Sequence, residues 1–425
     1  MAEIRRFRGL RFAASAGPLQ NLVAPPYDVL NQDERDAYAA KNPHNIVHLT
    51  LPEGKDDDRS KMVKYARSAA LLAEWRREGA LKRDEEPSLY RYTQTFTVPD
   101  SDDAVVRTAL LALIKVEPYE KGVVLPHEQT FPKHKEDRLR LLEATRTHLE
   151  SIFGLYEDEG ATLHRKIAGA PAAESATITT DDGIEHRFER IEDEAACREL
   201  SAGFADRKVW IADGHHRYET AMNFRAEQGA KDGPIPEDYM MMALSSMSDP
   251  GLVLLPTHRM IAELPIGPAK LEPLLQTKFN ARRVPNAQLM PELRRLAAPD
   301  CRAFGLALPG GTGYVMTLDH PDKAVKWIEG EGSPRLKTLD VTILHRIIFE
   351  GMLGFRGIDY CTYTRDAGEA ISKVGHGVAA SFLMNPPSVE DMRLIALGGE
   401  KMPQKSTYYY PKLLSGLAVW SLGDF

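Results

Sequence analysis

The sequence predicts a mixed α+β fold, and three observations lead to that prediction. Apolar and polar residues alternate over 89–98, which is the period of a half-buried strand. Apolar residues recur at helical spacing over 60–79. A short apolar run at 208–212 leads through a glycine turn into a helical segment at 216–228. Strands and helices are therefore interleaved along the chain.

The remaining elements follow from the same periodicities and from the turn residues that separate them. Further helices are expected over 31–40, 136–150, 193–205, 338–353 and 388–397. Further strands are expected over 46–51, 105–116, 152–156, 177–188, 239–247, 252–255 and 303–309. The strands at 89–98 and 105–116 are expected to form a hairpin.

The segment 229–236 is rich in Gly and Pro, which is typical of a domain boundary. We therefore expect an N-terminal domain over 1–235 that carries a β-rich insertion at about 85–200. A mixed α/β C-terminal domain over 236–425 is expected to close the cleft.

Composition limits the function. The chain of 425 residues has 54 Lys and Arg against 61 Asp and Glu, a net charge of −7, which argues against a general binder of nucleic acid or anionic membrane. No apolar run approaches the roughly 20 residues of a membrane span, and no signal peptide is recognisable. The three cysteines are far apart and suit a reducing compartment. We expect a cytoplasmic protein that binds small molecules. The sequence leaves open whether the chain forms a homo-oligomer.

The first candidate site is the strand–turn–helix passage around Asp213 and Gly214. Such a turn aims backbone N–H groups and the helix dipole at one point, and Arg217 adds a donor fork suited to phosphate. His215 and His216 are adjacent, so they cannot both face inward from one helix. Asp213 suits a metal ion or a proton. The alternative is that Asp213 only caps the helix.

The second candidate site lies between residues 121 and 149, where six Lys or Arg, four Asp or Glu and three His occur. Lys133, Lys135 and Arg138 are suited to contact phosphate oxygens. His127 and Glu128 are suited to proton transfer, or Glu128 to magnesium. A solvated charged loop at a helix start is the alternative, since charge runs are usually exposed.

The third candidate site is the stretch 398–412, where a glycine pair precedes Lys405 and Ser406. A lysine and a hydroxyl after glycines are suited to an anion, and a tight turn into a strand is the alternative. The proline-rich segment 23–28 is expected to line the same cleft.

Five motifs together resemble an uncharacterised family known as domain of unknown function 1015, over nearly the whole chain. They are Pro25-Pro26-Tyr27-Asp28, His127-Glu128, Lys135-Glu136-Asp137-Arg138-Leu139, Asp213-Gly214-His215-His216-Arg217-Tyr218 and Met402-Pro403-Gln404-Lys405-Ser406-Thr407. The resemblance by itself implies no activity.

The central motif is also similar to the ParB/sulfiredoxin-like superfamily, whose members bind nucleotide phosphates at a Gly-x-x-Arg turn. Gly214 and Arg217 match that turn. Sulfiredoxins have a catalytic cysteine where this chain has His215, so reduction of a sulfinic acid is not expected. The free-serine kinases of the superfamily are similar to 213–217 as it stands. The resemblance implies a ParB/sulfiredoxin-like core within 1–235.

This resemblance implies a nucleotide-dependent phosphotransferase that acts on a small hydroxyl metabolite, with free L-serine as the first candidate. The expected cofactor is Mg²⁺ with ATP or another nucleoside phosphate, held by Asp213 and Glu128. The catalytic candidates are Asp213, His216 and Glu128, with Asp28 and Glu34 also open as the base. The phosphate-binding candidates are Gly214, His215, Arg217, His127, Lys133, Arg138, Lys405 and Ser406.

Two alternatives come from other classes of protein. One is a nucleotide-binding or hydrolysing switch without metabolite turnover. The other is a metal-dependent hydrolase that uses Asp213, His216 and His127 to hold Zn, Mn or Fe.

Overall fold

The computed structural model describes residues 1–130, 132–357 and 360–425, with the side chains of 132–134 and 268 outside the description. By its contacts the chain divides into two units. Unit 1 comprises Met1–Pro126, Thr130–Val253 and Tyr409–Phe425, and unit 2 comprises His127–Gln129 and Leu254–Tyr408. The last residues of the chain therefore return to unit 1. The predicted mixed class is confirmed.

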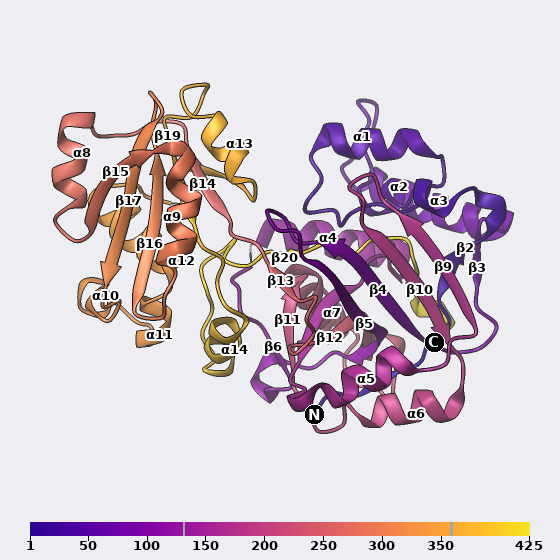
Figure 1. Ribbon diagram of the computed structural model, residues 1–425. Coiled ribbons are helices and arrows are strands. Elements are labelled where there is room, and N and C mark those ends of the chain that lie inside the picture. The colour runs from indigo at the N-terminus through magenta and orange to yellow at the C-terminus, as the bar shows by residue number, and fades with distance from the viewer. Residues whose placement is uncertain (131, 358–359) are drawn as a thin grey trace. The chain divides into compact units, whose positions relative to one another are not determined.

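Unit 1 is built on a mixed sheet of nine described strands in the order β6-β11-β8-β12-β5-β4-β10-β9, with β1 beside β5 (Figure 1). The strands are β1 (Ile4–Arg5), β4 (Leu89–Thr97), β5 (Ala104–Lys115), β6 (Val124–Leu125), β8 (Ile152–Tyr156), β9 (Glu174–Thr179), β10 (Glu185–Ile191), β11 (Val209–Asp213) and β12 (Tyr239–Ser246). β11 runs parallel to β6, and β12 runs parallel to β8, whereas the other pairs are antiparallel.

Helices of unit 1 pack around this sheet in two apolar clusters. They are α1 (Gln32–Lys41), α2 (Val47–Thr50), α3 (Val63–Glu78), α4 (Pro132–Thr145), α5 (Thr162–Gly169), α6 (Glu194–Ala202) and α7 (His215–Glu227). One cluster joins the sheet strands to α5, α6 and α7. The other lies among α2, α3, the N-terminal segment and Leu141 of α4. Two further strand pairs are β2 (Leu10–Phe12) with β3 (Leu81–Arg83) and β7 (Thr147–His148) with β21 (Trp420–Ser421).

Unit 2 contains a second sheet, which is antiparallel and has six described strands in the order β15-β17-β16-β19-β14-β18. The strands are β14 (His258–Ile261), β15 (Asn280–Pro285), β16 (Cys301–Ala307), β17 (Thr312–Asp319), β18 (Cys361–Thr364) and β19 (Ala380–Met384). The helices are α8 (Pro268–Leu275), α9 (Leu289–Leu296), α10 (Lys323–Trp327), α11 (Pro334–Lys337), α12 (Asp340–Ile343), a π-helix (Leu344–Met352), α13 (Ala367–Ser372) and α14 (Val389–Leu397). β13 (Val253–Leu254) and β20 (Tyr409–Tyr410) lie where the chain passes between units.

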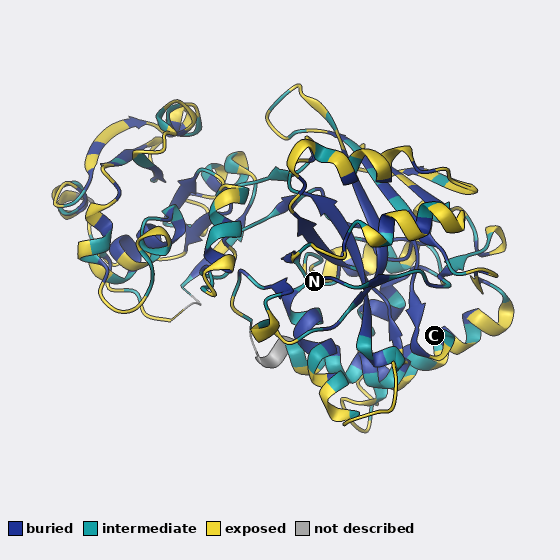
Figure 2. Cartoon of the chain, turned by 90° about the horizontal axis from the view of Figure 1, so that it is seen from below, coloured by how far each residue is buried: buried dark blue, intermediate teal, exposed yellow. Residues whose placement is uncertain are grey.

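Burial follows the sheets. Figure 2 shows the strands as mostly buried, whereas the helices expose one side. β11 is buried from Val209 to Ala212, as expected for a strand covered on both faces. None of the helices in the described ranges combines the length and apolar character that a bilayer crossing requires.

Some expectations differ from the structure. Residues 46–51 were expected as a strand, and the structure has α2 there. The side chain of Asn45 accepts from Val47 N in the turn that leads into this helix, and such local bonds compete with strand pairing. The strands within 85–200 belong to the same sheet as β11, and the insertion stays a prediction. The change of unit follows Val253 rather than 229–236, because β12 pairs with β5 and β8.

Gly154, in the middle of β8, offers a test of this packing. A Cβ there would lie 2.5 Å from Met242 Sδ and 2.9 Å from Val209 Cγ1. Gly154→Ala should therefore lower the free energy of unfolding by about 1 to 3 kcal/mol, measured by urea denaturation. Gly169→Ala, where a Cβ meets no atom within 4 Å, is the control. Equal stability of the two variants would contradict the close packing of β8.

Candidate active site

The turn between β11 and α7 is the centre of the candidate site in unit 1. Gly214 has φ 93° and ψ 29°, in the left-handed region that favours glycine. A Cβ at Gly214 would lie 3.0 Å from Nη2 and 3.1 Å from Nε of Arg217. The guanidinium of Arg217 therefore lies against the turn at the N-terminal end of α7, and the spacing of these two residues has a steric reason.

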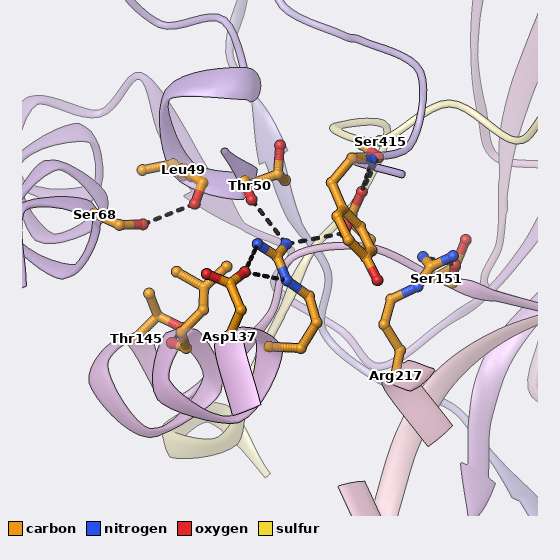
Figure 3. A network of polar contacts seen from close by, with 12 residues as sticks. Leu49, Thr50, Ser68, Asp137, Thr145, Ser151, Arg217 and Ser415 are labelled. Atoms are coloured by element: carbon orange, nitrogen blue, oxygen red, sulfur yellow. Dashed lines mark hydrogen bonds and ion pairs between the residues drawn. The ribbon is translucent and has the colours of Figure 1, made fainter. Parts of the chain in front are cut away.

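Arg217 is anchored on one side only. Its Nη1 donates to the carbonyl of Ser151 at 2.7 Å (Figure 3), whereas its Nε is buried and has no hydrogen-bond partner among the described residues. Burial lowers the pKa of Arg217, but nearby carboxylates, those of Glu150, Asp213 and Asp28, more than reverse this and raise it. A charged guanidinium thus keeps a donor for which the described part of the chain offers no acceptor.

Asp213, the last residue of β11, forms an ion pair with Lys412. The distance from Nζ to Oδ2 is 3.2 Å, and both side chains are largely buried. Burial raises the pKa of Asp213, but Lys412 and Arg217 outweigh this and hold the pKa well below its usual range. Asp213 is therefore an anion at neutral pH and a weak proton acceptor, which suits a metal ligand better than a general base.

Glu150 connects the turn to two distant segments. Its carboxylate accepts a hydrogen bond from Tyr27 N at 3.0 Å and another from Ser415 Oγ at 3.0 Å. Ser415 also pairs through its backbone with Ala24. The carboxylate thus fixes the loop that carries the exposed Asp28.

Arg138, on α4, supports the same loop. Its Nη1 donates to the carbonyl of Thr50 at 2.8 Å, and its Nε donates to Asp137 at 3.1 Å (Figure 3). Its guanidinium lies 4.0 Å from the centre of the Tyr27 ring, and Nη1 is 3.9 Å from Glu150 Oε2. These contacts favour a positioning role for Arg138 over the direct phosphate contact predicted from the sequence.

A second group of predicted residues comes together within unit 2. The backbone N–H of Lys405 donates to Glu128 Oε1 at 3.2 Å, and the His127 carbonyl accepts from Met402 N at 2.7 Å. The buried His127 ring contacts Thr407 Oγ1 at 2.8 Å through Nε2. The motifs His127-Glu128 and Met402–Thr407, which are far apart in the chain, therefore share one local structure.

The remaining predicted residues have different surroundings. His215 is buried in the first turn of α7, and His216 is half-buried beside it. Ser406 is buried, and its hydroxyl donates to the Pro403 carbonyl. Lys133 has a side chain outside the described residues. Glu34 accepts from Asn31 N at 2.8 Å in a capping box at the start of α1, which gives it a structural task.

Sequence reasoning missed the residues that hold the turn in place. Lys412 ends the third predicted stretch but was not singled out, and its position two residues after Tyr410 gave no sign of Asp213 as its partner. Glu150 and Ser415 have no motif around them. Pairing between Glu150 and Ser415 spans 265 residues of sequence, so no local pattern could have indicated it.

The described residues include no group of three or more His, Cys, Asp or Glu that could hold a metal ion. Asp213 instead offers a single ionised carboxylate. One or two carboxylates are enough for Mg²⁺ that also binds substrate phosphates, whereas a catalytic zinc site takes three protein ligands. The donor set therefore fits Mg²⁺ brought with a nucleotide.

A family model described as "protein of unknown function (DUF1015)" matches residues 4–342. The chain belongs to this family. The resemblance to domain of unknown function 1015 that the sequence showed is thereby confirmed.

Several solved structures are similar to the chain of this DUF1015 protein. A free serine kinase mutant in complex with AMP matches with 13% identity and a TM-score of 0.36, over 74% of this chain and 94% of that chain. Another free serine kinase mutant, in complex with ADP, matches with 12% identity and a TM-score of 0.37 over the same shares. A conserved hypothetical protein from Pyrococcus furiosus matches with 12% identity and a TM-score of 0.35, over 74% and 97%. No curated protein matches. At these scores the likeness carries no argument about activity.

His148, which lies beside Arg138 and Arg217 around a cavity of about 50 Å³, should make unit 1 sensitive to acid. Burial lowers the pKa of His148 to about 4, and its ring stacks on Trp420. The unfolded chain, with an ordinary pKa near 6.5, binds the proton more readily, so stability is present above that pH and is lost as pH falls towards 4. The loss should reach about 3 kcal/mol.

His148→Phe keeps the stacking and removes the titrating group. Its urea midpoint, followed by tryptophan fluorescence, should fall less than that of the wild type between pH 7 and pH 4.5, about the range set by these pKa values. The exposed His376→Asn serves as the control and should follow the wild type. An unchanged pH profile in His148→Phe would show that this histidine is not held neutral.

Proposed function

We propose that this DUF1015 protein is a nucleotide-dependent phosphotransferase that transfers a phosphoryl group to a small hydroxyl compound. One observation carries the proposal. At the turn between β11 and α7, the charged Arg217 lies against Gly214 and keeps a buried Nε without a hydrogen-bond partner among the described residues. A buried donor without a partner costs free energy unless a ligand supplies the acceptor.

A phosphate group is the ligand that this turn suits best. The first turn of α7 directs backbone N–H groups and the positive end of the helix dipole towards the same place. Arg217 adds a planar fork that matches phosphate oxygens. A glycine before the helix lets the phosphate approach the backbone closely, since no Cβ is in the way.

Asp213 would hold Mg²⁺ together with the phosphates, as its ionised carboxylate at the strand end allows. When bound, the ion would neutralise charge that develops on the transferring group. Lys412, which pairs with Asp213 at 3.2 Å, keeps that carboxylate ionised and oriented.

The acceptor is proposed to be a small alcohol, with free L-serine first because residues 213–217 resemble the corresponding turn of free-serine kinases. Phosphoryl transfer needs an aligned hydroxyl and a group that accepts its proton. Within unit 1, Asp28 and His216 are the candidates for that group. Glu128, the third candidate from the sequence, belongs to unit 2. Asp213 is a weak base, and Glu34 is engaged in its capping box.

The two alternative functions, a nucleotide-binding switch and a metal-dependent hydrolase, differ from this proposal in what they require of the site. A nucleotide-binding switch would use the same turn and yield no phosphorylated product. A hydrolase with zinc, manganese or iron would need a cluster of ligands, and no such cluster is present among the described residues.

Replacement of Arg217 tests the phosphate contact. Arg217→Ala should abolish the thermal stabilisation that ATP, ADP, CTP, GTP or pyrophosphate gives with Mg²⁺, because the phosphates lose their fork. A ligand at a hundred times its Kd stabilises by about 2.7 kcal/mol, so the loss is measurable as a shift in Tm. If Arg217→Ala still transfers phosphate at a measurable rate, its kcat should be lower than that of the wild type by a factor of about 10² to 10³.

The matched control is Arg225→Ala, which removes an arginine at the other end of α7 that pairs with Asp238. It should keep the ligand-induced shift, even if its own Tm changes. An unchanged shift in Arg217→Ala, or the same loss in both variants, would overturn the phosphate contact.

The proton acceptor is tested with Asp28→Asn, Glu128→Gln and His216→Gln, assayed for phosphoserine from ATP and L-serine by ³¹P NMR. The variant that removes the base should lose about 10² to 10⁴ in kcat and keep its nucleotide-induced Tm shift, because only proton transfer is impaired. Glu34→Gln is the control. If all three variants retain wild-type kcat, none of these side chains is the base. If no alcohol is phosphorylated while nucleotide still binds, the switch is favoured.

A further inference from the structure

A large cavity lies within unit 2, and every residue around it belongs to that unit. Its volume is about 680 Å³, within the range of small-molecule sites. Apolar side chains such as Val325, Leu339 and Met384 share its wall with charged ones. We call it the unit 2 cavity. The proposed phosphotransfer site in unit 1 contributes no residue to it.

Most charges around the unit 2 cavity are compensated in pairs. Arg302 Nε lies 3.1 Å from Asp340 Oδ1, and Arg335 Nη1 lies 2.8 Å from Asp391 Oδ1. These pairs satisfy two of the three guanidinium groups that line the cavity. They leave the cation Arg259 and the carboxylate of Asp322 outside these two pairs.

Arg259 is buried, with 1% of its surface exposed, and no ion pair with a carboxylate is found for it among the described residues. Its Nη1 donates to the Thr257 carbonyl and contacts Met384 Sδ at 3.1 Å, and its Nη2 donates to the Lys405 carbonyl at 3.2 Å. Its Nε has no hydrogen-bond partner in the described structure. Burial lowers the pKa of Arg259 to about 10, so the group is still charged at neutral pH.

Thr257, two residues before Arg259, is likewise a buried residue with a polar atom that lacks a partner in the described part of the chain. It is 3% exposed, lines the same cavity, and its Oγ1 has no hydrogen-bond partner among the described residues. Two buried residues on one short segment, one of them charged, thus line a cavity large enough for a metabolite, and each has one polar atom without a partner among the described residues. A buried cation is stable when an anion with good geometry pairs with it.

We propose that the unit 2 cavity is a second binding site, which takes a small organic anion through the guanidinium of Arg259 and the hydroxyl of Thr257. The anionic group is a carboxylate or a phosphate monoester, because both present two oxygens to a guanidinium fork. The ligand's body packs on the apolar wall. This site goes beyond the proposed phosphotransfer, since it needs neither Mg²⁺ nor the turn at Gly214.

Isothermal titration calorimetry on the full chain tests this site with two groups of probes. One group is inorganic phosphate and glycerol 3-phosphate, and the other is citrate and L-glutamate. We expect one group to bind the wild type. Thr257→Val should raise Kd about tenfold, and Arg259→Gln by about a hundredfold or more, as expected for lost hydrogen bonds to a charged group.

Thr257→Val is the decisive variant, because it removes a hydroxyl that the free protein does not pair. Its Tm without ligand should therefore equal or exceed that of the wild type, so a fall in affinity is not a folding defect. The matched control is Thr342→Val. Thr342 is also buried with an unpaired Oγ1, and it does not line the cavity. It should bind the probe as the wild type does.

Three results would overturn the proposal. No probe binds the wild type, or Thr257→Val and Arg259→Gln leave Kd unchanged, or Arg217→Ala abolishes the binding and thereby places the anion in unit 1. None of these results depends on nucleotide binding, so failure of this site and failure of the proposed phosphotransfer are distinguishable.

Discussion

The buried carboxylate of Glu150 is the interaction on which the candidate site in unit 1 depends. It accepts from Tyr27 N near the start of the chain and from Ser415 Oγ near its end. The next residue, Ser151, gives its carbonyl to Arg217. Three segments that are distant in sequence therefore meet at one side chain, which is only 7% exposed. A buried carboxylate is costly unless it is hydrogen-bonded and paired, and here these contacts meet that condition.

This arrangement explains why the last residues of the chain belong to unit 1. Lys412 supplies the cation for Asp213, and Ser415 pairs with Ala24. The loop at Asp28 is thus held from two sides, and Arg138 packs on its tyrosine ring. Loops that carry chemistry are usually positioned by a rigid scaffold. Here the scaffold is the buried sheet around β8 and β11, and the polar network joins the loop to it.

The sequence was most informative where structure is local. The strand, glycine turn and helix over 209–227 were predicted because burial, the turn residue and the helical period all lie within one short stretch. The apolar run at 46–51 was predicted as a strand, and the structure has α2 there, preceded by a turn in which Asn45 Oδ1 accepts from Val47 N. In such a short run the local hydrogen bond outweighs the β propensity of its side chains.

The site itself could be predicted only in part. Gly214 and Arg217 were found because their spacing follows from one turn of helix. Glu150 and Lys412 were not predicted, because their partners lie far away in the sequence. Nothing in the neighbouring residues distinguishes them from other charged residues of the chain. The cavity of unit 2 was not predicted from the sequence for the same reason. Thr257 and Arg259 stand in a strand-like stretch, and only the folded chain reveals that Thr257 Oγ1 and Arg259 Nε have no hydrogen-bond partner among the described residues.

Arg217 and Arg259 each keep an unpaired Nε, but the charges around them differ, and this difference bears on what each site binds. The field at Arg217 comes from the carboxylates Glu150, Asp213 and Asp28. An anion that entered there alone would meet their repulsion, so a nucleotide phosphate needs an accompanying cation, which is the role we assign to Mg²⁺ at Asp213. Arg259 has no carboxylate as an ion-pair partner among the described residues. A simple anion can therefore compensate it directly, and a metal ion would only weaken that attraction.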